Sequence, residues 1–301
     1  MLLKYLNDHL LSEVAAYLSD RDLNALVQTC RRTSGRLNIT LYHRNIPAGR
    51  PYLLQWGVQK GVVGTVRQAI VVGASVAYKE ARYNPVLVQA AILGNLDMVA
   101  TILTAYDADV NVTGMYNRTA LTNACILADM NLVKLLFRAA AEAGVELAVD
   151  VADAAGMTPI MYAARLCNVD LFRMLLATGR VNASARCRSG LTPLHHAIDC
   201  GGITEDVREK CVELLLLAGA DPAARDRHSR TVLRLATDRN LGEIVRQLLA
   251  TGEVDPDAEE AYGRLETARA LARRRSRRNL TRMFELYTAR RVRVSVRLTY
   301  H

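Results

Sequence analysis

The chain has 301 residues, half of them hydrophobic and 23% charged, which is enough apolar material for an extended core. No stretch without a charged residue exceeds 14 residues, too short to span a bilayer, and charges within the first eleven residues argue against a signal peptide. The formal net charge is +9, but residues 264–301 hold twelve Arg against two acidic residues. The rest of the chain is therefore almost neutral, and we expect a protein of the cytoplasm or the nucleus.

The first fifty residues carry the pattern of short amphipathic helices. A stripe of apolar residues at helical spacing predicts the first helix, and its members are Leu10, Leu11, Val14, Tyr17 and Leu18. Asp22 is a suitable N-cap for a second helix that carries Leu23 and Leu26. This segment is either a separate binding unit or an N-terminal cap that covers the apolar end of the structure formed by the later residues.

From residue 51 onward one short pattern recurs. It begins with Thr or another residue in its place, continues with Leu and Ala at helical spacing, and ends with a Leu-rich stretch and a turn. The first positions of the copies are Tyr52, Pro85, Thr119, Thr158, Thr192, Thr231 and Thr267. These anchor positions lie 33 to 39 residues apart, and a period in this range predicts a stack of similar helical units. The longer spacings place insertions at residues 139–149 and 201–210.

The clearest copy reads Thr192-Pro193-Leu194-His195, followed later by Gly219-Ala220-Asp221. The Thr hydroxyl can cap the first helix, and Pro is suited to its first turn. This pattern resembles the ankyrin repeat, a turn followed by two antiparallel helices. The resemblance implies an all-α ankyrin-repeat solenoid, with about six units over residues 51–263 and a capping repeat with an Arg-rich tail over 264–301. It also implies that His195 ties neighbouring turns together and that protein partners bind on the concave face.

Residues 4–46 contain spaced apolar residues followed by Tyr-Leu-Ser, Asp-Leu and Thr-Cys-Arg-Arg. This order is similar to that of an F-box of the fungal type that precedes ankyrin repeats. The usual opening Leu-Pro reads Leu6-Asn7 here. The resemblance implies that residues 1–50 dock onto a Skp-type adaptor of a cullin ubiquitin ligase. The residues expected to bind the adaptor are Leu10, Leu11, Val14, Leu18, Leu23 and Leu26.

The C-terminal Arg cluster has three possible roles. Residues 273–278 serve either as a charged face of the capping repeat, as a nuclear import signal or as a phosphate-binding patch. No aromatic residues alternate with these Arg residues, which argues against nucleic-acid binding as their main role. The alternation of Val and Leu with Arg and Ser over residues 292–298 is typical of a strand, which has no obvious place in a helical stack.

Signs of catalysis are few. The six Cys form no Cys-x-x-Cys pair and show no repeated spacing, which predicts neither a disulfide nor a zinc site. His195 and His196 are adjacent and point about 100° apart on a helix, which is unsuitable for holding one metal ion. Phosphate-loop and nucleophile-elbow motifs are lacking. We therefore predict no catalytic residue, no metal site, no cofactor and no enzyme.

The expected function is recruitment of a protein partner. Specificity should lie at the tips of the turns, where Tyr and Arg are residue types that dominate binding energy. The candidates are Tyr116, Arg118, Arg186, Arg188, Arg227 and His228. Together with the F-box resemblance, this predicts the substrate-recruiting subunit of a ubiquitin ligase. The alternative is an ankyrin scaffold or regulator without a ligase, whose N-terminal segment serves only as a cap.

Overall fold

The computed structural model describes residues 22, 52–77, 83–258 and 267–299, with backbone alone for 52–53 and 290–299. Within these ranges there are 14 α-helices, one short 3-10 helix and no β-strand. The chain divides into two compact units, residues 1–148 (unit 1) and 149–301 (unit 2). The all-α class and the stacked helical pairs expected from the sequence are confirmed.

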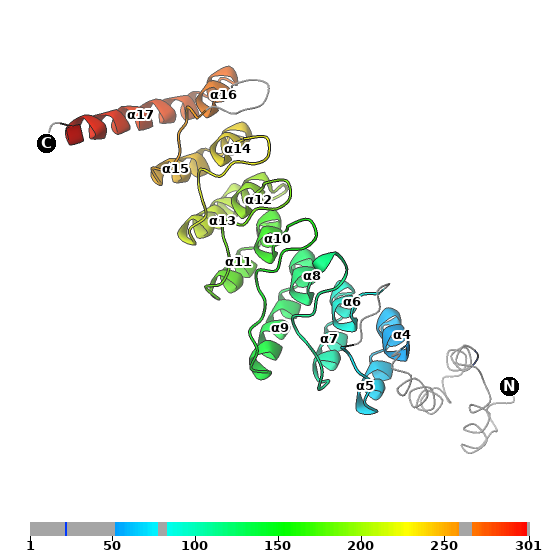
Figure 1. Cartoon of the computed structure of the whole chain (residues 1–301). Helices are drawn as coiled ribbons and strands as arrows, with labels where there is room; N and C mark the ends of the chain where they lie inside the picture. The colour runs from blue at the N-terminus through cyan, green and yellow to red at the C-terminus, as the bar shows by residue number, and fades with distance from the viewer. Residues whose placement is uncertain (1–21, 23–51, 78–82, 259–266, 300–301) are drawn as a thin grey trace, which may run out of the picture. The chain divides into compact units, whose positions relative to one another are not determined.

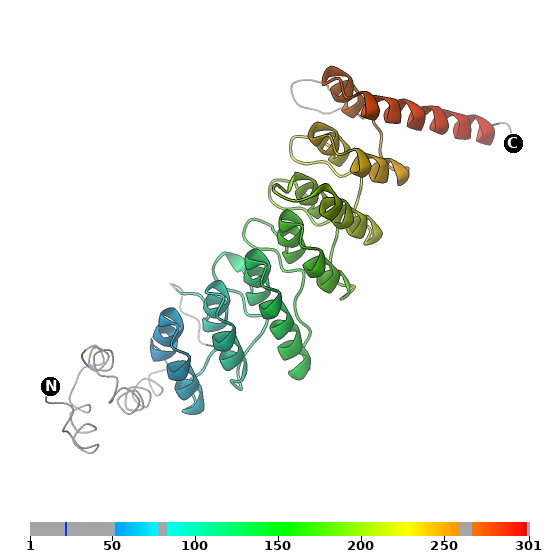
Figure 2. The same ribbon diagram turned by 180° about the vertical axis from the view of Figure 1, so that it is seen from behind.

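Unit 1 contains three helical pairs. These are α4 (Tyr52–Lys60) with α5 (Val63–Val71), α6 (Val86–Ile92) with α7 (Leu96–Leu103), and α8 (Ala120–Leu127) with α9 (Met130–Glu142). The first helices of the pairs contact one another in a row, α4 with α6 and α6 with α8, and the second helices form a parallel row. Figures 1 and 2 show these two layers from opposite sides.

Unit 2 contains four pairs built in the same way. They are α10 (Pro159–Leu166) with α11 (Val169–Leu176), α12 (Pro193–Asp199) with α13 (Glu205–Leu217), α14 (Val232–Arg239) with α15 (Gly242–Ala250), and α16 (Ala268–Arg274) with α17 (Arg278–Thr299). In both units we call the first helix of each pair the inner helix and the second the outer helix. Helix α17 continues well past the end of its neighbour α15 (Figure 1).

The core of each unit follows from the repeated spacing. Leu194, Ala197 and Ile198 lie two, five and six residues after the anchor Thr192, and all three are fully buried. The outer helices contribute larger side chains, such as Phe172 and Leu215, to the same layer. Each fully buried side chain of this size contributes roughly 1.5 to 3 kcal/mol, and neighbouring repeats are needed to cover it.

The ends of the helices are fixed by a few polar groups and backbone turns. The side chains of Asn95, Asp129 and Asn168 accept backbone N–H groups at the starts of α7, α9 and α11. Nine residues after several anchors the chain takes a left-handed conformation that turns the inner helix into the outer one. These positions are Gly94, Ala128, Cys167, Asn240 and Ser276.

The helix boundaries explain two features of the sequence. The insertions in the third and fifth repeats lengthen the outer helices α9 and α13, which have 13 residues each. The strand-like alternation at residues 292–298 lies in α17, so the strand interpretation is wrong. Leu280 and Phe284 anchor the first turns of α17 in the core, and extending an existing helix costs much less than starting a new element.

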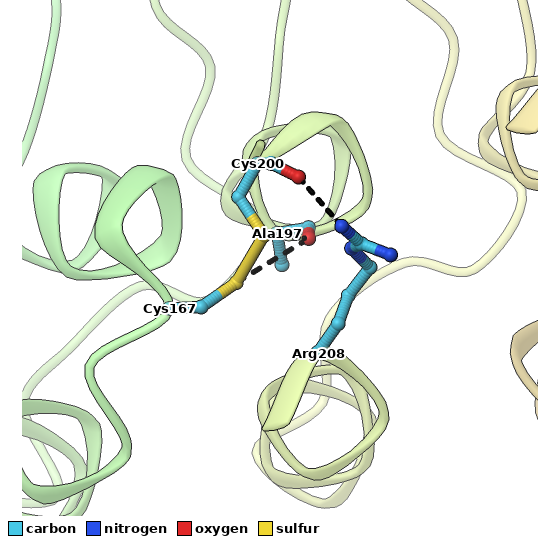
Figure 3. Close-up of a disulfide and its surroundings, with 4 residues drawn as sticks. All are labelled: Cys167, Ala197, Cys200 and Arg208. Carbon is cyan, nitrogen blue, oxygen red and sulfur yellow. Dashed lines mark hydrogen bonds between the residues drawn. A yellow bond between two sulfur atoms is a disulfide. The ribbon is translucent and has the colours of Figure 1, made fainter. Parts of the chain in front are cut away.

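The expectation that no disulfide forms is also wrong. Cys167, at the end of α10, is bonded to Cys200, at the end of α12 (Figure 3). These residues follow their anchors Thr158 and Thr192 by nine and eight residues, so the stacking of adjacent repeats places them side by side. Arg208 of α13 donates to the carbonyl oxygen of Cys200 at 2.7 Å and secures the end of α12.

The N-terminal segment lies outside the described residues apart from Asp22. The predicted adaptor-binding residues Leu10, Leu11, Val14, Leu18, Leu23 and Leu26 are therefore not placed. The domain boundaries at residues 50 and 263 also stay predictions. Among the helices that the structure describes, none has the length and apolar character required to cross a membrane.

Candidate partner-binding surface

In unit 2 a hairpin loop precedes each of α10, α12 and α14, and we call residues 150–158, 183–192 and 222–231 the finger loops. Each loop is closed by an equivalent backbone hydrogen bond. The N–H groups of Asp153, Cys187 and Asp226 donate to the carbonyls of Met157, Leu191 and Arg230, with N···O distances of 2.9, 3.0 and 3.1 Å. A left-handed residue two positions before each anchor completes the turn. These residues are Gly156, Gly190 and Ser229.

Adjacent finger loops are joined through their backbones. The N–H of Arg188 donates to the carbonyl of Ala155 at 2.8 Å, and that of Arg227 donates to Ser189 at 3.3 Å. A Cβ atom at Gly156 would lie only 2.9 Å from the nitrogen of Arg188. Glycine is therefore required for this close approach, and the finger loops form one continuous surface within unit 2.

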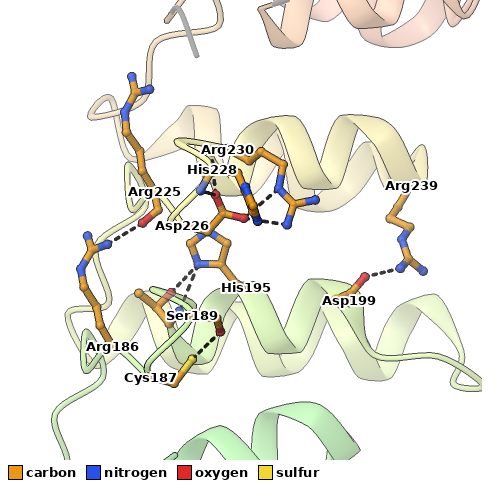
Figure 4. A network of polar contacts seen from close by, with 11 residues as sticks. Arg186, Cys187, Ser189, His195, Asp199, Arg225, Asp226, His228, Arg230 and Arg239 are labelled. Atoms are coloured by element: carbon orange, nitrogen blue, oxygen red, sulfur yellow. Dashed lines mark hydrogen bonds and ion pairs between the residues drawn. The ribbon is translucent and has the colours of Figure 1, made fainter. Parts of the chain in front are cut away.

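Asp226 organises the third finger loop (Figure 4). Its carboxylate accepts the backbone N–H groups of His228 and Arg230 at 2.8 and 2.9 Å and the Nε of Arg230 at 2.7 Å. Burial raises the pKa of Asp226, but these hydrogen bonds and the charge of Arg230 outweigh it, so the pKa lies below its ordinary value. Asp153 has the equivalent role in the first finger loop, where it also accepts the hydroxyl of Tyr162 at 2.6 Å.

His195 lies beneath this loop. Its Nδ1 accepts the backbone N–H of Thr192 at 3.2 Å in a capping box at the start of α12. The ring extends toward Asp226 and Arg230 of the next finger loop (Figure 4). Burial lowers the pKa of His195 against the opposing effects of the Arg230 backbone and the Asp226 charge, so the ring is neutral near pH 7. This position agrees with a structural role between adjacent turns.

Four of the predicted partner-binding residues lie together on two neighbouring finger loops of unit 2. Arg186, Arg188, Arg227 and His228 are all exposed. Arg186 bonds to the carbonyl of Arg225 and lies 4.0 Å from the carboxylate of Asp221, which links the two loops. The tips therefore present a group of basic side chains on a fixed backbone.

The other two predicted residues belong to unit 1, in the loop before α8. Tyr116 is 67% exposed and has a left-handed backbone, and the guanidinium of Arg118 lies 6.0 Å from the centre of its ring. Relative to its anchor Thr119, Gly114 stands at the same position as Asp153 and Asp226 in unit 2. The side chain of Asn84 substitutes for the missing carboxylate by accepting the N–H of Met115 at 2.6 Å.

A hollow of about 310 Å³ opens on the inner helices of unit 2, and sequence reasoning missed it. It lies between α12, α14 and α16 and is lined by Leu191, His195, His196, Asp199, Asp226, Arg230, Arg234, Leu235, Asp238, Leu271, Arg274 and Arg275. We call it the arginine hollow. Many of these residues stand four, seven or eight positions after an anchor Thr. Aligning the repeats on their anchors would have revealed this shared spacing.

The carboxylates of the arginine hollow are all bonded to Arg side chains. Asp226 pairs with Arg230 and Asp238 pairs with Arg275, at 2.7 and 2.8 Å. Asp199 pairs with Arg239, which lies beside the hollow (Figure 4). Burial lowers the pKa of His196 to about 4, and neighbouring His195 and Arg165 lower it further against the opposing charge of Asp199. His196 is therefore uncharged at neutral pH.

Comparison with known proteins agrees with this geometry. A protein-family model described as ankyrin repeats in three copies matches residues 129–226. Residues 129–226 are therefore ankyrin repeats. Ankyrin repeats generally serve as protein-interaction modules. No three His, Cys, Asp or Glu side chains of the described ranges are grouped so that they would hold a metal ion.

Two curated relatives are named after ankyrin repeats. The chain is 26% identical over 211 residues to the ankyrin repeat protein YahD of Escherichia coli K12, a match that covers 69% of this chain and 98% of YahD. It is 40% identical over 117 residues to the ankyrin repeat, SAM and basic leucine zipper domain-containing protein 1 of Mus musculus. That second match covers 35% of this chain and only 23% of the mouse protein.

Solved structures show the same fold. An ankyrin repeat domain of Acinetobacter baumannii AYE superposes with a TM-score of 0.58 and 23% identity, covering 67% of this chain and 98% of that one. The ankyrin repeat domain of Bcl-3, a member of the IkappaB protein family, gives a TM-score of 0.57 and 22% identity, with 73% and 92% covered. At these identities the comparison establishes the ankyrin fold alone.

Proposed function

We propose that this chain is a non-catalytic recruiting protein that holds a protein partner on its ankyrin repeats. The observation that carries the proposal is the surface of unit 2, where backbone hydrogen bonds join the finger loops and basic side chains project from them. A fixed backbone that presents Arg side chains lowers the entropy lost on binding. We place this activity in the cytoplasm or the nucleus.

The finer proposal is that the chain serves as the substrate-recruiting subunit of a Skp-cullin-F-box ubiquitin ligase. Its support is the F-box-like order of residues 4–46, and the ankyrin comparisons do not extend to this role. In such a complex the N-terminus would dock onto the adaptor and the repeats would hold the substrate. The alternative is an ankyrin scaffold or regulator that works without a ligase.

Partner capture by tagged full-length chain tests the first proposal. Tyr116→Ala with Arg188→Ala removes one exposed tip from each unit and should weaken capture of the partner that the wild type retains, while cooperative unfolding is preserved. Lys134→Ala, an exposed residue on the outer helix α9, is the matched control. A partner set that is the same for all three chains would reject the finger-loop surface.

A purified Skp adaptor tests the ligase proposal. The wild type should retain the adaptor, and Leu11→Asp with Leu18→Asp should release it while capture through the repeats continues. If the wild type does not bind the adaptor, the scaffold alternative is favoured. The two experiments fail independently because they address different segments of the chain.

A further inference from the structure

The second and third finger loops of unit 2 carry Arg at equivalent positions. Each loop has an Arg six and four residues before its anchor, Arg186 and Arg188 in the second loop and Arg225 and Arg227 in the third. We call Arg186, Arg188 and Arg227 the tip patch, and we propose that it binds a carboxylate-rich segment of a partner protein. The inference rests on the proposed recruiting function and adds the chemical class of the partner.

The residue between the two Arg of each loop points into the fold. Cys187 and Asp226 are each only 8% exposed, whereas the Arg residues of the tip patch are exposed. Successive side chains of extended backbone point to opposite faces, and the isolated bridge between Arg225 and Thr231 is a mark of such backbone in the third loop. The tip patch therefore lies on the solvent face of both loops.

The two loops bring Arg188 and Arg227 onto one surface. The N–H of Arg227 donates at 3.3 Å to the carbonyl of Ser189, which directly follows Arg188. A Cβ atom at Gly190 would lie 3.2 Å from Cγ of Arg227, so this side chain begins against the turn of the second loop. Arg residues on a backbone fixed in this way lose less freedom when a partner binds.

Two guanidinium groups of the tip patch are available to a ligand. Within the described ranges, no carboxylate bonds to the side chain of Arg188 or Arg227. The buried carboxylate of the third loop, that of Asp226, is already held by Arg230 and by backbone N–H groups. A planar guanidinium can offer a partner carboxylate two parallel N–H bonds.

The other two Arg of these loops also bond within the loops. Arg186 donates to the backbone carbonyl of Arg225 (Figure 4), and its guanidinium lies 4.0 Å from the carboxylate of Asp221. Arg225 donates to the carbonyl of Ser229 at 3.3 Å and is only partly exposed, so we do not count it in the tip patch. The side chain of Arg186 stays 49% exposed, which leaves part of its guanidinium open to a partner.

The first finger loop shows that these Arg side chains are not needed to build the loop. It has Ala152 and Ala154 at the equivalent positions and is closed by the same backbone hydrogen bond, from Asp153 to the carbonyl of Met157. Neighbouring like charges destabilise a fold through their repulsion. Loop structure therefore does not explain the Arg residues of the tip patch, whereas binding of an anion does.

The extent of the patch favours a peptide over a nucleic acid. The first finger loop carries Asp150 and Asp153 and no basic residue, so the basic surface ends on that side after two loops. A nucleic acid gains its affinity from many phosphate contacts along a longer basic track. Two or three carboxylates of a short Glu-rich or Asp-rich segment match the guanidinium groups that the tip patch offers.

Fluorescence anisotropy with the full-length chain tests the proposal, and the probe is a short fluorescein-labelled peptide of alternating Glu and Ser. Its binding should be saturable and roughly fivefold or more tighter than that of the same peptide with Gln in place of Glu. Arg188→Glu and Arg227→Glu should each weaken binding by roughly fivefold or more, because each places a like charge in the patch. Thermal unfolding shows whether each variant is folded, and either variant alone tests the patch.

The control is Arg173→Glu on the outer helix α11, which changes the net charge equally at an exposed position. Its affinity should stay within about twofold of the wild type at physiological salt. Equal binding of the Glu and Gln peptides, or equal loss in the control and in both tip variants, would overturn the proposal. Binding of an oligothymidine that Arg188→Glu abolishes, without binding of the Glu peptide, would overturn it in favour of a nucleic acid.

The capture experiment separates this proposal from the recruiting function. Tyr116→Ala with Arg188→Ala removes part of the tip patch. If that variant loses the captured partner while the wild type does not bind the Glu peptide, the recruiting function stands and the carboxylate-rich class of partner is rejected.

Discussion

Arg230 places both Nε and a terminal nitrogen 2.7 Å from the same oxygen, Oδ2, of Asp226, while Oδ1 of that carboxylate accepts two backbone N–H groups of the finger loop. One buried carboxylate thus closes the loop and orients an Arg side chain at the mouth of the arginine hollow. The turn and the binding surface are linked through this residue.

Asp226→Ala should lower the free energy of unfolding by about 2 to 3 kcal/mol, because it leaves buried N–H groups without an acceptor and frees Arg230. Equilibrium urea unfolding followed by circular dichroism measures the loss. The control is Asp221→Ala, which removes an exposed Asp that bonds the N–H of Ala223 at 2.8 Å. We expect the control to cost less than about 1 kcal/mol. Equal losses would show that Asp226 has no special role.

Reduction of the Cys167–Cys200 bond should destabilise unit 2. The bond closes a loop with a sequence separation of 33, and chain entropy predicts a contribution of about 3 to 4 kcal/mol. Dithiothreitol should therefore lower the Tm by roughly 10 °C, as scanning calorimetry would measure. Cys200→Ser should unfold at the lower temperature with or without the reductant, whereas Cys187→Ser should keep the wild-type response. An unchanged Tm on reduction would contradict the prediction.

The depressed pKa of His196 makes stability depend on pH. The pKa is about 4 in the folded chain and about 6.5 in the unfolded chain, so between these values only the unfolded chain takes up the proton. Stability should fall as the pH falls from 6.5 to 4 and should be independent of this group above 6.5. His196→Gln should remove up to about 3 kcal/mol of this loss in urea titrations at several pH values. The control is Asn131→Gln, at an exposed position of α9 that does not titrate, which should keep the wild-type slope.

Ala128 offers a stabilising substitution in unit 1. It ends α8 with φ of 54°, a conformation that costs an L-residue free energy and costs glycine almost none. Ala128→Gly should raise the free energy of unfolding by about 0.5 to 1 kcal/mol in urea titration. Ala141→Gly, at an exposed position in the last turn of α9, should instead lower it, by less than about 1 kcal/mol. A loss at both positions would contradict the conformational argument.

Much of the fold was predictable because the repeat fixes local structure. The anchors Thr119, Thr192, Thr231 and Thr267 each precede an inner helix, and the Leu and Ala residues that follow them are buried. The helical course of residues 292–298 was not predictable from alternation, because period alone does not reveal that a helix has already begun at Arg278.

The candidate site was predictable only in part. The finger-loop tips followed from the turn pattern, but the arginine hollow and the disulfide depend on which residues of successive repeats face each other. His196, Leu235 and Leu271 are far apart in the chain and share the fourth position after their anchors. Stacking brings them together, so the hollow becomes visible only when the repeats are aligned by anchor and not read along the chain.

The bond between Cys167 and Cys200 also has a mechanical consequence. A stack of repeats pulled from its ends gives way one repeat at a time, since each repeat contacts only its neighbours. With the bond intact, the residues between the two Cys cannot extend under load. An optical-tweezer trace of the oxidised chain should therefore release about 110 Å less contour length than that of the reduced chain. The oxidised protein would behave as a shorter tether between whatever its two ends hold.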